Sequence, residues 1–166
     1  MPIQDAGDRG MVNGMNRQAP RALPVTFRPR NLRIVAYGLA ALIMATMVFL
    51  AVIMPPNWGI QDRISLILVG ALIGGGLRFL ARPRLELTEH RVTVVNVIRT
   101  HVLVWPEIID ARMPVGEPWP SIDLADGSTL AVMGIQSNDG ELARAYLEEF
   151  RHHLRERGEA AEPSRG

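Results

Sequence analysis

The chain has 166 residues, a hydrophobic fraction of 48%, a net charge of +1 and no cysteine. This length accommodates one compact domain with its attachments, and the lack of cysteine excludes disulfides, thiolate metal sites, thiol nucleophiles and cysteine redox motifs. The charge is uneven: residues 1–33 hold six Arg against two Asp, residues 78–84 hold three Arg, and residues 85–166 hold eight Arg against fourteen Asp and Glu. Phosphate binding requires a concentrated basic face, so this acidic C-terminal half argues against a nucleic-acid partner.

An uncharged apolar run extends from Ile34 to Met54. As a helix it would be about 31 Å long, which matches a hydrocarbon core of about 30 Å. A buried core helix is the alternative, but a chain of this size rarely needs a helix that is apolar on every face. A cleaved signal peptide is disfavoured because a long segment precedes the run and no small-residue cleavage site follows it. The sequence therefore predicts a transmembrane helix at residues 34–54.

A second apolar run predicts another transmembrane helix at residues 64–81. It includes Arg78, whose long side chain can reach the lipid headgroups, and as a helix it spans about 27 Å. Pro55 and Pro56 end the first helix, so only a short connection separates the two. Residues 31–82 are therefore predicted to form a transmembrane hairpin of antiparallel helices.

Small residues mark surfaces on which the predicted helices can pack. Two small-xxx-small steps occur in the second helix and one occurs in the first. These pairs are Gly70–Gly74, Ala71–Gly75 and Ala41–Ala45. Such steps allow close backbone approach in lipid, so they predict contact within the hairpin and leave open a homo-oligomer formed through these helices.

Arginines flank the apolar runs on one side. Five lie closely before the first run and three lie at or after the end of the second, whereas the connection holds only Arg63. By the positive-inside rule, this is a two-span protein of the cell membrane with both termini in the cytoplasm. The same side chains are expected to contact anionic membrane lipids. The residues predicted for headgroup contact are Arg30, Arg33, Arg78, Arg82 and Arg84.

Both ends of the chain lack apolar periodicity. Residues 1–30 are rich in Gly, Pro, Asn, Gln and Arg, a composition typical of disorder, and they are predicted to be a disordered basic tail. Residues 158–166 are predicted to be a second disordered tail.

After Pro83 the sequence changes to short runs rich in Val, Ile, Leu and Thr, which are typical of strands. Six strands are predicted, at residues 85–88, 91–98, 101–105, 108–113, 121–125 and 128–135. Their short connections make neighbours antiparallel, and Asp126-Gly127 predicts a type I′ turn. Alternation at Ile109, Ala111 and Met113 predicts one buried and one solvated sheet face.

An amphipathic helix follows the strands. Asn138 and Glu141 form a pair that resembles a capping box, and Gly158 ends the helix. The apolar stripe recurs every four residues and consists of Leu142, Tyr146, Phe150 and Leu154. The domain at residues 83–157 is therefore predicted to be α+β, a small antiparallel sheet bent into a partial barrel and capped by this helix.

Several segments of this domain carry a family resemblance. They are Arg82-Pro-Arg-Leu-Glu-Leu-Thr, the Val-rich strand after it, Val104-Trp-Pro-Glu-Ile-Ile, Asp126-Gly-Ser-Thr-Leu and the final helix. Residues 82–155 thus resemble the bacterial pleckstrin-homology-like (PH-like) domains that follow a pair of membrane helices, of the low molecular weight protein antigen type.

The resemblance implies a PH-like fold and a recognition module at the membrane, with peptide, protein or lipid ligands and no catalysis. Phosphoinositide-binding members place several Lys and Arg around the first hairpin. Here that hairpin reads Thr88-Glu89-His90-Arg91, with Arg99 further along. The resemblance therefore does not extend to a phosphoinositide site.

No group of residues has the spacing of a catalytic or metal site. His152 and His153 are neighbours on the predicted helix and point about 100° apart, so all four histidines are interpreted as solvated rather than as metal ligands or bases. The carboxylates, including Glu148 and Glu149, are expected to be solvated as well. We therefore expect no enzyme, no metal and no cofactor.

Trp105 and Trp119 are either core anchors or an aromatic binding edge, and the core interpretation is favoured. The longest loop of the domain, at residues 113–120, is a better candidate for recognition, because loops bind partners more often than cores do. The residues predicted to contact a partner are Met113, Glu117 and Trp119.

These observations predict a membrane-tethered adaptor or assembly factor whose domain binds a protein partner at the cytoplasmic face. The alternative is a sensor of lipid or of a small ligand at the membrane surface. A hydrolase or transferase with an atypical site is the least favoured hypothesis.

Overall fold

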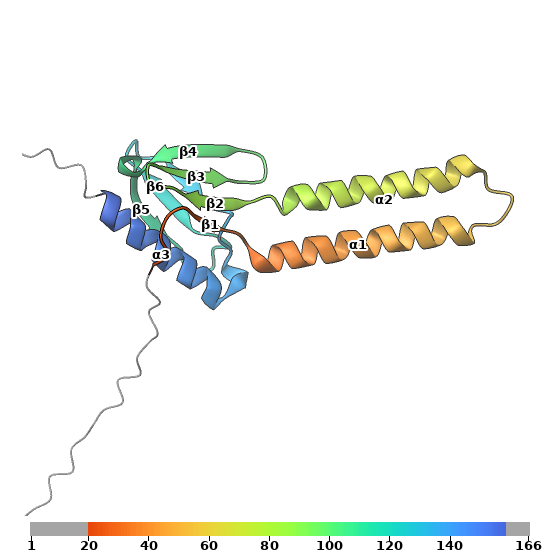
Figure 1. Ribbon diagram of the computed structural model, residues 1–166, viewed down its shortest axis with the longest axis horizontal. Helices are drawn as coiled ribbons and strands as arrows, with labels where there is room; N and C mark the ends of the chain where they lie inside the picture. Colours follow the sequence, from red (N-terminus) through yellow and green to blue (C-terminus); the bar gives the residue numbers. More distant parts are fainter. Residues whose placement is uncertain (1–19, 159–166) are drawn as a thin grey trace, which may run out of the picture.

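The computed structural model describes residues 20–158. It consists of a long helical hairpin and a small α+β domain from which the hairpin projects (Figure 1). Of the tails predicted at residues 1–30 and 158–166, residues 1–19 and 159–166 lie outside the described part of the chain.

The hairpin is formed by α1 (Arg30–Ile53) and α2 (Ile60–Leu80), close to the predicted positions. α2 begins four residues earlier than expected because the Asp62 carboxylate accepts a hydrogen bond from the Gly59 N–H at 2.9 Å and caps the helix. The Arg63 guanidinium donates to the carbonyl oxygens of Met54, at 2.7 Å, and of Ala51. The connection is therefore short and held at the end of α1.

The two helices pack through only part of the predicted small-residue surface. A Cβ atom on Gly70 would lie 3.1 Å from Met47 Cγ, and one on Gly74 would lie 3.9 Å from Ala40 Cβ, so both glycines face α1 as expected. The other two pairs do not make this contact. Ala71, Gly75, Ala41 and Ala45 are exposed instead. On α1 the buried residues are Ala36 and Ala51, which lie on a different face from the predicted pair.

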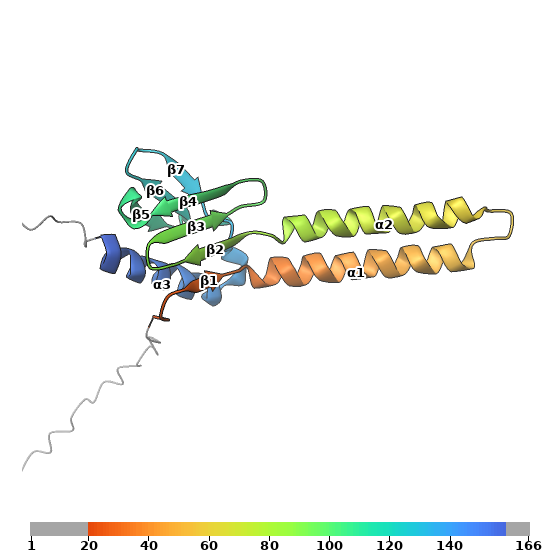
Figure 2. The same cartoon turned by 45° about the horizontal axis from the view of Figure 1, so that its top comes forward.

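Seven strands and a C-terminal helix make up the domain within the described residues (Figures 1 and 2). They are β1 (Val25–Phe27), β2 (Arg84–Leu87), β3 (Arg91–Val95), β4 (Thr100–Val104), β5 (Ile108–Arg112), β6 (Ser121–Leu124), β7 (Thr129–Ala131) and α3 (Glu141–Gly158). One antiparallel sheet has the order β1-β2-β3-β4 and the other has the order β5-β6-β7. The predicted α+β fold is confirmed, and one strand overlaps each of the six predicted ranges, although β3 and β7 end at Val95 and Ala131, before the predicted ends.

β1 was not predicted, because it lies in the segment expected to be a disordered tail. It pairs antiparallel with β2, with Val25 opposite Leu87 and Phe27 opposite Leu85. Val25 and Phe27 are buried in the core. Three residues are too few to show a strand periodicity. The hairpin is therefore an insertion between β1 and β2, and the domain begins before it rather than at residue 83.

The segment before β1 is also ordered and lies on α3. Arg21 Nε and Nη2 donate to the Glu149 carboxylate at 2.9 and 3.0 Å. This hydrogen bonding raises the pKa of the Arg21 guanidinium above its ordinary value. Glu149, which was expected to be solvated, is thus paired with the chain that leads into β1.

The turn at Asp126-Gly127 differs from the predicted type. Only Gly127 has a positive φ, of 83°, and its N–H donates to the Leu124 carbonyl at 2.9 Å. This is a three-residue loop with glycine in the left-handed position rather than a type I′ turn. Asp126 Oδ1 accepts the hydroxyl and the N–H of Ser128, and these bonds lower the pKa of Asp126.

A bulge in β5 reverses the predicted exposure of one apolar side chain. The β5–β6 register shifts between Ile108 and Asp110, so Ile108 and Ala111 are buried while Ile109 is 66% exposed. The extra residue displaces Ile109 from the buried face.

The core lies between the two sheets and α3. Phe27, Leu85, Ile122 and Phe150 are almost fully buried there. Trp105 is 3% exposed and its Nε1 donates to the Thr88 carbonyl at 3.2 Å, so its interpretation as a core anchor is confirmed. The α3 stripe that faces this core consists of Ala143, Leu147, Phe150 and Leu154, with Leu142 and Tyr146 half-buried.

Candidate functional site

Asp139 connects the domain to the first turn of the hairpin. Its carboxylate accepts the backbone N–H of Arg30 at 2.9 Å and of Asn31 at 2.8 Å, the first two residues of α1. α1 has neither a side-chain cap of its own nor an acidic residue in its first turn. Asp139 therefore pairs N–H groups that the helix leaves free and places a negative charge at the positive end of the helix dipole.

The segment just before α3 also contacts the start of α1. Asn138, predicted as the helix N-cap, lies instead in a 3-10 turn, Ser137–Asp139. Its carbonyl accepts a hydrogen bond from Asn31 Nδ2 at 2.8 Å. Gly140, with a φ of 62°, then leads into α3. Asn138, which was expected to cap α3, thus contacts the start of α1 instead.

Four of the five arginines predicted to contact headgroups lie at the ends of α1 and α2 that adjoin the domain. Arg30 and Arg33 are in the first turn of α1, and Arg78 and Arg82 lie at and just after the end of α2. Arg84 differs, because it is half-buried in β2 and its Nε lies 2.5 Å from Glu86 Oε1. Its charge is offset by Glu86. The other four arginines, Arg30, Arg33, Arg78 and Arg82, are called the basic collar.

The β3–β4 loop reaches toward the same end of the domain (Figures 1 and 2). Val95, the last residue of β3, pairs with Arg84, so the residues after it pass the start of β2 toward α2. Asn96 fixes the loop by donating to the Ala131 carbonyl at 2.8 Å and accepting the Met133 N–H at 3.0 Å. At the tip, Ile98 is 84% exposed.

Ile98 and the neighbouring exposed Arg99 were missed as site residues. The sequence predicted Arg99-Thr100 as a two-residue connection. In the structure Asn96 donates its N–H to the Arg99 carbonyl at 2.9 Å, and residues 96–99 form the connection. An adjacent apolar and basic residue at a hairpin tip is the signal that could have identified them.

The predicted partner loop at residues 113–120 is only partly assembled. Met113 and Glu117 line one depression, but Trp119 is half-buried and is not among its lining residues. The others that line it are Arg112, Pro114, Ser121, Thr129 and Arg151. Pro118 accepts the Ser137 N–H at 2.9 Å, which connects the loop to the segment that holds α1.

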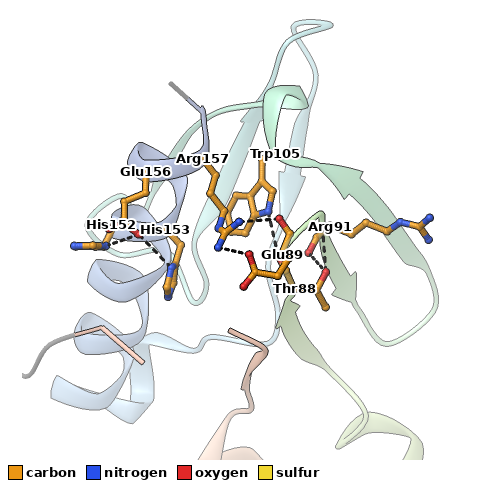
Figure 3. Close-up of polar contacts among 8 residues, drawn as sticks. All are labelled: Thr88, Glu89, Arg91, Trp105, His152, His153, Glu156 and Arg157. Atoms are coloured by element: carbon orange, nitrogen blue, oxygen red, sulfur yellow. Dashed lines mark hydrogen bonds and ion pairs between the residues drawn. The ribbon is translucent and has the colours of Figure 1, made fainter. Parts of the chain in front are cut away.

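A polar cluster covers the C-terminal part of α3 (Figure 3). Arg157 Nη2 lies 2.6 Å from Glu89 Oε2, and Arg157 Nη1 donates to the Glu89 carbonyl at 2.9 Å. Its guanidinium also lies 5.9 Å from the centre of the Trp105 ring. Arg157 therefore ties the end of α3 to the β2–β3 turn.

The interpretation of all four histidines as solvated is wrong for His153, which is 5% exposed. It follows Phe150 by three residues and so falls on the buried side of α3. His152 is half-buried, and both rings turn toward Glu156 (Figure 3).

We expect Asp139→Asn to destabilise the junction by about 1 kcal/mol, because the neutral amide loses the charge at the α1 terminus and offers one acceptor oxygen in place of two. Chemical denaturation of the full chain in detergent measures this change. Glu148→Gln, an exposed carboxylate on α3, is the matched control and should stay within about 0.5 kcal/mol of the wild type. Equal stability of the Asp139 variant would contradict the assigned cap.

The comparisons with known proteins agree with this architecture. Residues 82–153 match the model of the bacterial PH domain. Proteins of Mycobacterium bovis and of two Mycobacterium tuberculosis strains, each named as uncharacterised, are 29% identical over 141 residues, which cover 82% of this chain and 92% of theirs. An alignment of that extent necessarily includes the hairpin. No solved structure matches significantly. The similarity to the bacterial PH domain therefore covers residues 82–153, the part of the domain that follows the hairpin, and does not include β1.

Proposed function

We propose that this protein is a membrane-anchored recognition module, in which the hairpin crosses the cell membrane and the PH domain binds a protein partner at the cytoplasmic face. The observation that carries the anchoring is the exposure of the hairpin. Only 11% of the most apolar part of α1 and 6% of that of α2 is buried. A core helix of a water-soluble protein would be largely covered, since exposed apolar surface costs about 25 cal/mol per Å².

The distribution of charge supports the proposed orientation. The basic collar of Arg30, Arg33, Arg78 and Arg82 lies at the domain end of the helices. At the opposite end, Arg63 is engaged with carbonyl groups that terminate α1, and Asp62 precedes it. The positive-inside rule then favours the domain end as cytoplasmic.

A free sheet edge supports a protein partner. β4 pairs only with β3 among the described strands, and its side chains Val102 and Val104 are 56% and 44% exposed. Exposed apolar edge strands accept an extended segment of another chain by main-chain hydrogen bonding. The depression lined by Met113 and Glu117 remains a predicted second contact.

Lipid sensing is a second candidate function, favoured by the β3–β4 loop. Ile98 and Arg99 project on the side of the basic collar, where the proposed anchoring puts the bilayer surface. An apolar side chain beside a cation suits the boundary between headgroups and acyl chains.

The orientation is testable by cysteine labelling, because the chain has no cysteine of its own. With Asn57→Cys, in the connection of the hairpin, we expect labelling of intact cells by a membrane-impermeant maleimide. With Ser128→Cys, in the β6–β7 loop, labelling should require permeabilised cells. Labelling of both positions only after permeabilisation would contradict the two-span topology.

Partner binding is testable by placing a photoreactive amino acid at Val102 in cells that contain the full chain. A discrete protein adduct is expected from this position and none from Glu148, the exposed control on α3. Lipid adducts from Ile98 without any protein adduct from Val102 would favour the sensor instead. A well-expressed protein that yields no protein adduct at Val102 would contradict partner binding along β4.

A further inference from the structure

The buried ring of His153 lacks hydrogen-bond partners. Neither its Nδ1 nor its Nε2 has a partner among the described residues, and His152 Nδ1 is likewise buried without one. A buried polar group without a partner costs about 1–3 kcal/mol, and in native structures it often has an undetected water or ion beside it.

Both histidines direct Nδ1 toward the same carboxylate oxygen (Figure 3). His152 Nδ1 lies 3.4 Å and His153 Nδ1 lies 3.7 Å from Glu156 Oε2. One ligand atom from each of the three residues lies within 4.8 Å of the others. Although the two Cβ atoms diverge around the helix, the Glu156 side chain extends back over the preceding turn and lies between the rings.

These separations fit a shared cation better than direct hydrogen bonds. N–H···O bonds are typically about 2.7–3.2 Å long, shorter than either distance. Zinc lies about 2.0–2.2 Å from imidazole nitrogen and carboxylate oxygen, which places neighbouring tetrahedral ligands about 3.4 Å apart. The separations must therefore shrink by up to about 1.4 Å, and rotation of the partly exposed side chains of His152 and Glu156 can contribute to this.

We propose that His152, His153 and Glu156 form a binding site for a late first-row divalent cation, represented by Zn²⁺. Two imidazoles and one carboxylate are ligands that suit such ions. The nearby positive charge of Arg157 is offset by its ion pair with Glu89. Glu156 is 57% and His152 38% exposed in their side chains, so a remaining coordination position faces water. The site does not depend on the proposed membrane function.

The test uses the full chain in detergent, purified without a histidine tag and treated with a chelator. Titration calorimetry with Zn²⁺ should show one bound ion per chain, and Co²⁺ should give the visible absorption of a tetrahedral site. Zn²⁺ should also raise the unfolding temperature, because it binds the folded state. Absence of binding at Zn²⁺ concentrations up to about 1 mM would overturn the proposal.

Substitutions test whether these three residues bind the ion. Glu156→Gln and His152→Asn, at accessible positions, should each weaken Zn²⁺ binding by on the order of tenfold or more and remove the thermal shift, while the unfolding temperature without metal stays unchanged. Glu148→Gln and His90→Asn are controls and should bind as the wild type does. Unchanged affinity in both the Glu156 and His152 variants would place the ion elsewhere and overturn the site.

Discussion

The pairing of β1 with β2 determines how the rest of the structure is arranged. These strands lie directly before and after the hairpin, and Phe27 and Leu85 are paired and fully buried in the core. Pro29 and Pro83, which lead into and out of the helices, are buried too. Both ends of the hairpin are therefore fixed by the sheet, and Asp139 adds a second attachment at the start of α1.

This arrangement gives the domain a defined near end and far end relative to the hairpin. The β3–β4 loop, the segment before α3 and the basic collar share the near end, whereas the β6–β7 loop is at the far end (Figure 2). β4 extends from one end to the other. With the hairpin in a bilayer, as proposed, a partner strand paired with β4 would be held in a fixed position relative to the lipid.

The sequence predicted those elements that have strong local signals. Long apolar runs identified α1 and α2, and short β-branched runs identified β2 to β7. β1 was missed because it is three residues long and its partner strand lies beyond the whole hairpin. The bulge that exposes Ile109 and the capping of α1 by Asp139 depend on tertiary contacts that no local pattern contains.

The candidate site was predicted less completely, for related reasons. Four collar arginines are where sequence reasoning placed them, but Arg84 is paired with Glu86. The tip residues Ile98 and Arg99 become prominent only once the register of β3 with β2 is known. Burial of His153 follows from which side of α3 packs on the core, and its approach to Glu156 follows from side-chain conformation.

Because β1 and β2 fix both of its ends, the hairpin is expected to continue rigidly from the sheet of the domain. Double electron–electron resonance in lipid nanodiscs can measure the distance between spin labels at Ala71→Cys, on α2, and Ala125→Cys, in the β6–β7 loop. The labelling is specific because the chain has no other cysteine. A single narrow distance distribution is expected. A broad distribution, typical of a domain on a flexible tether, would show that the sheet does not hold the hairpin rigidly.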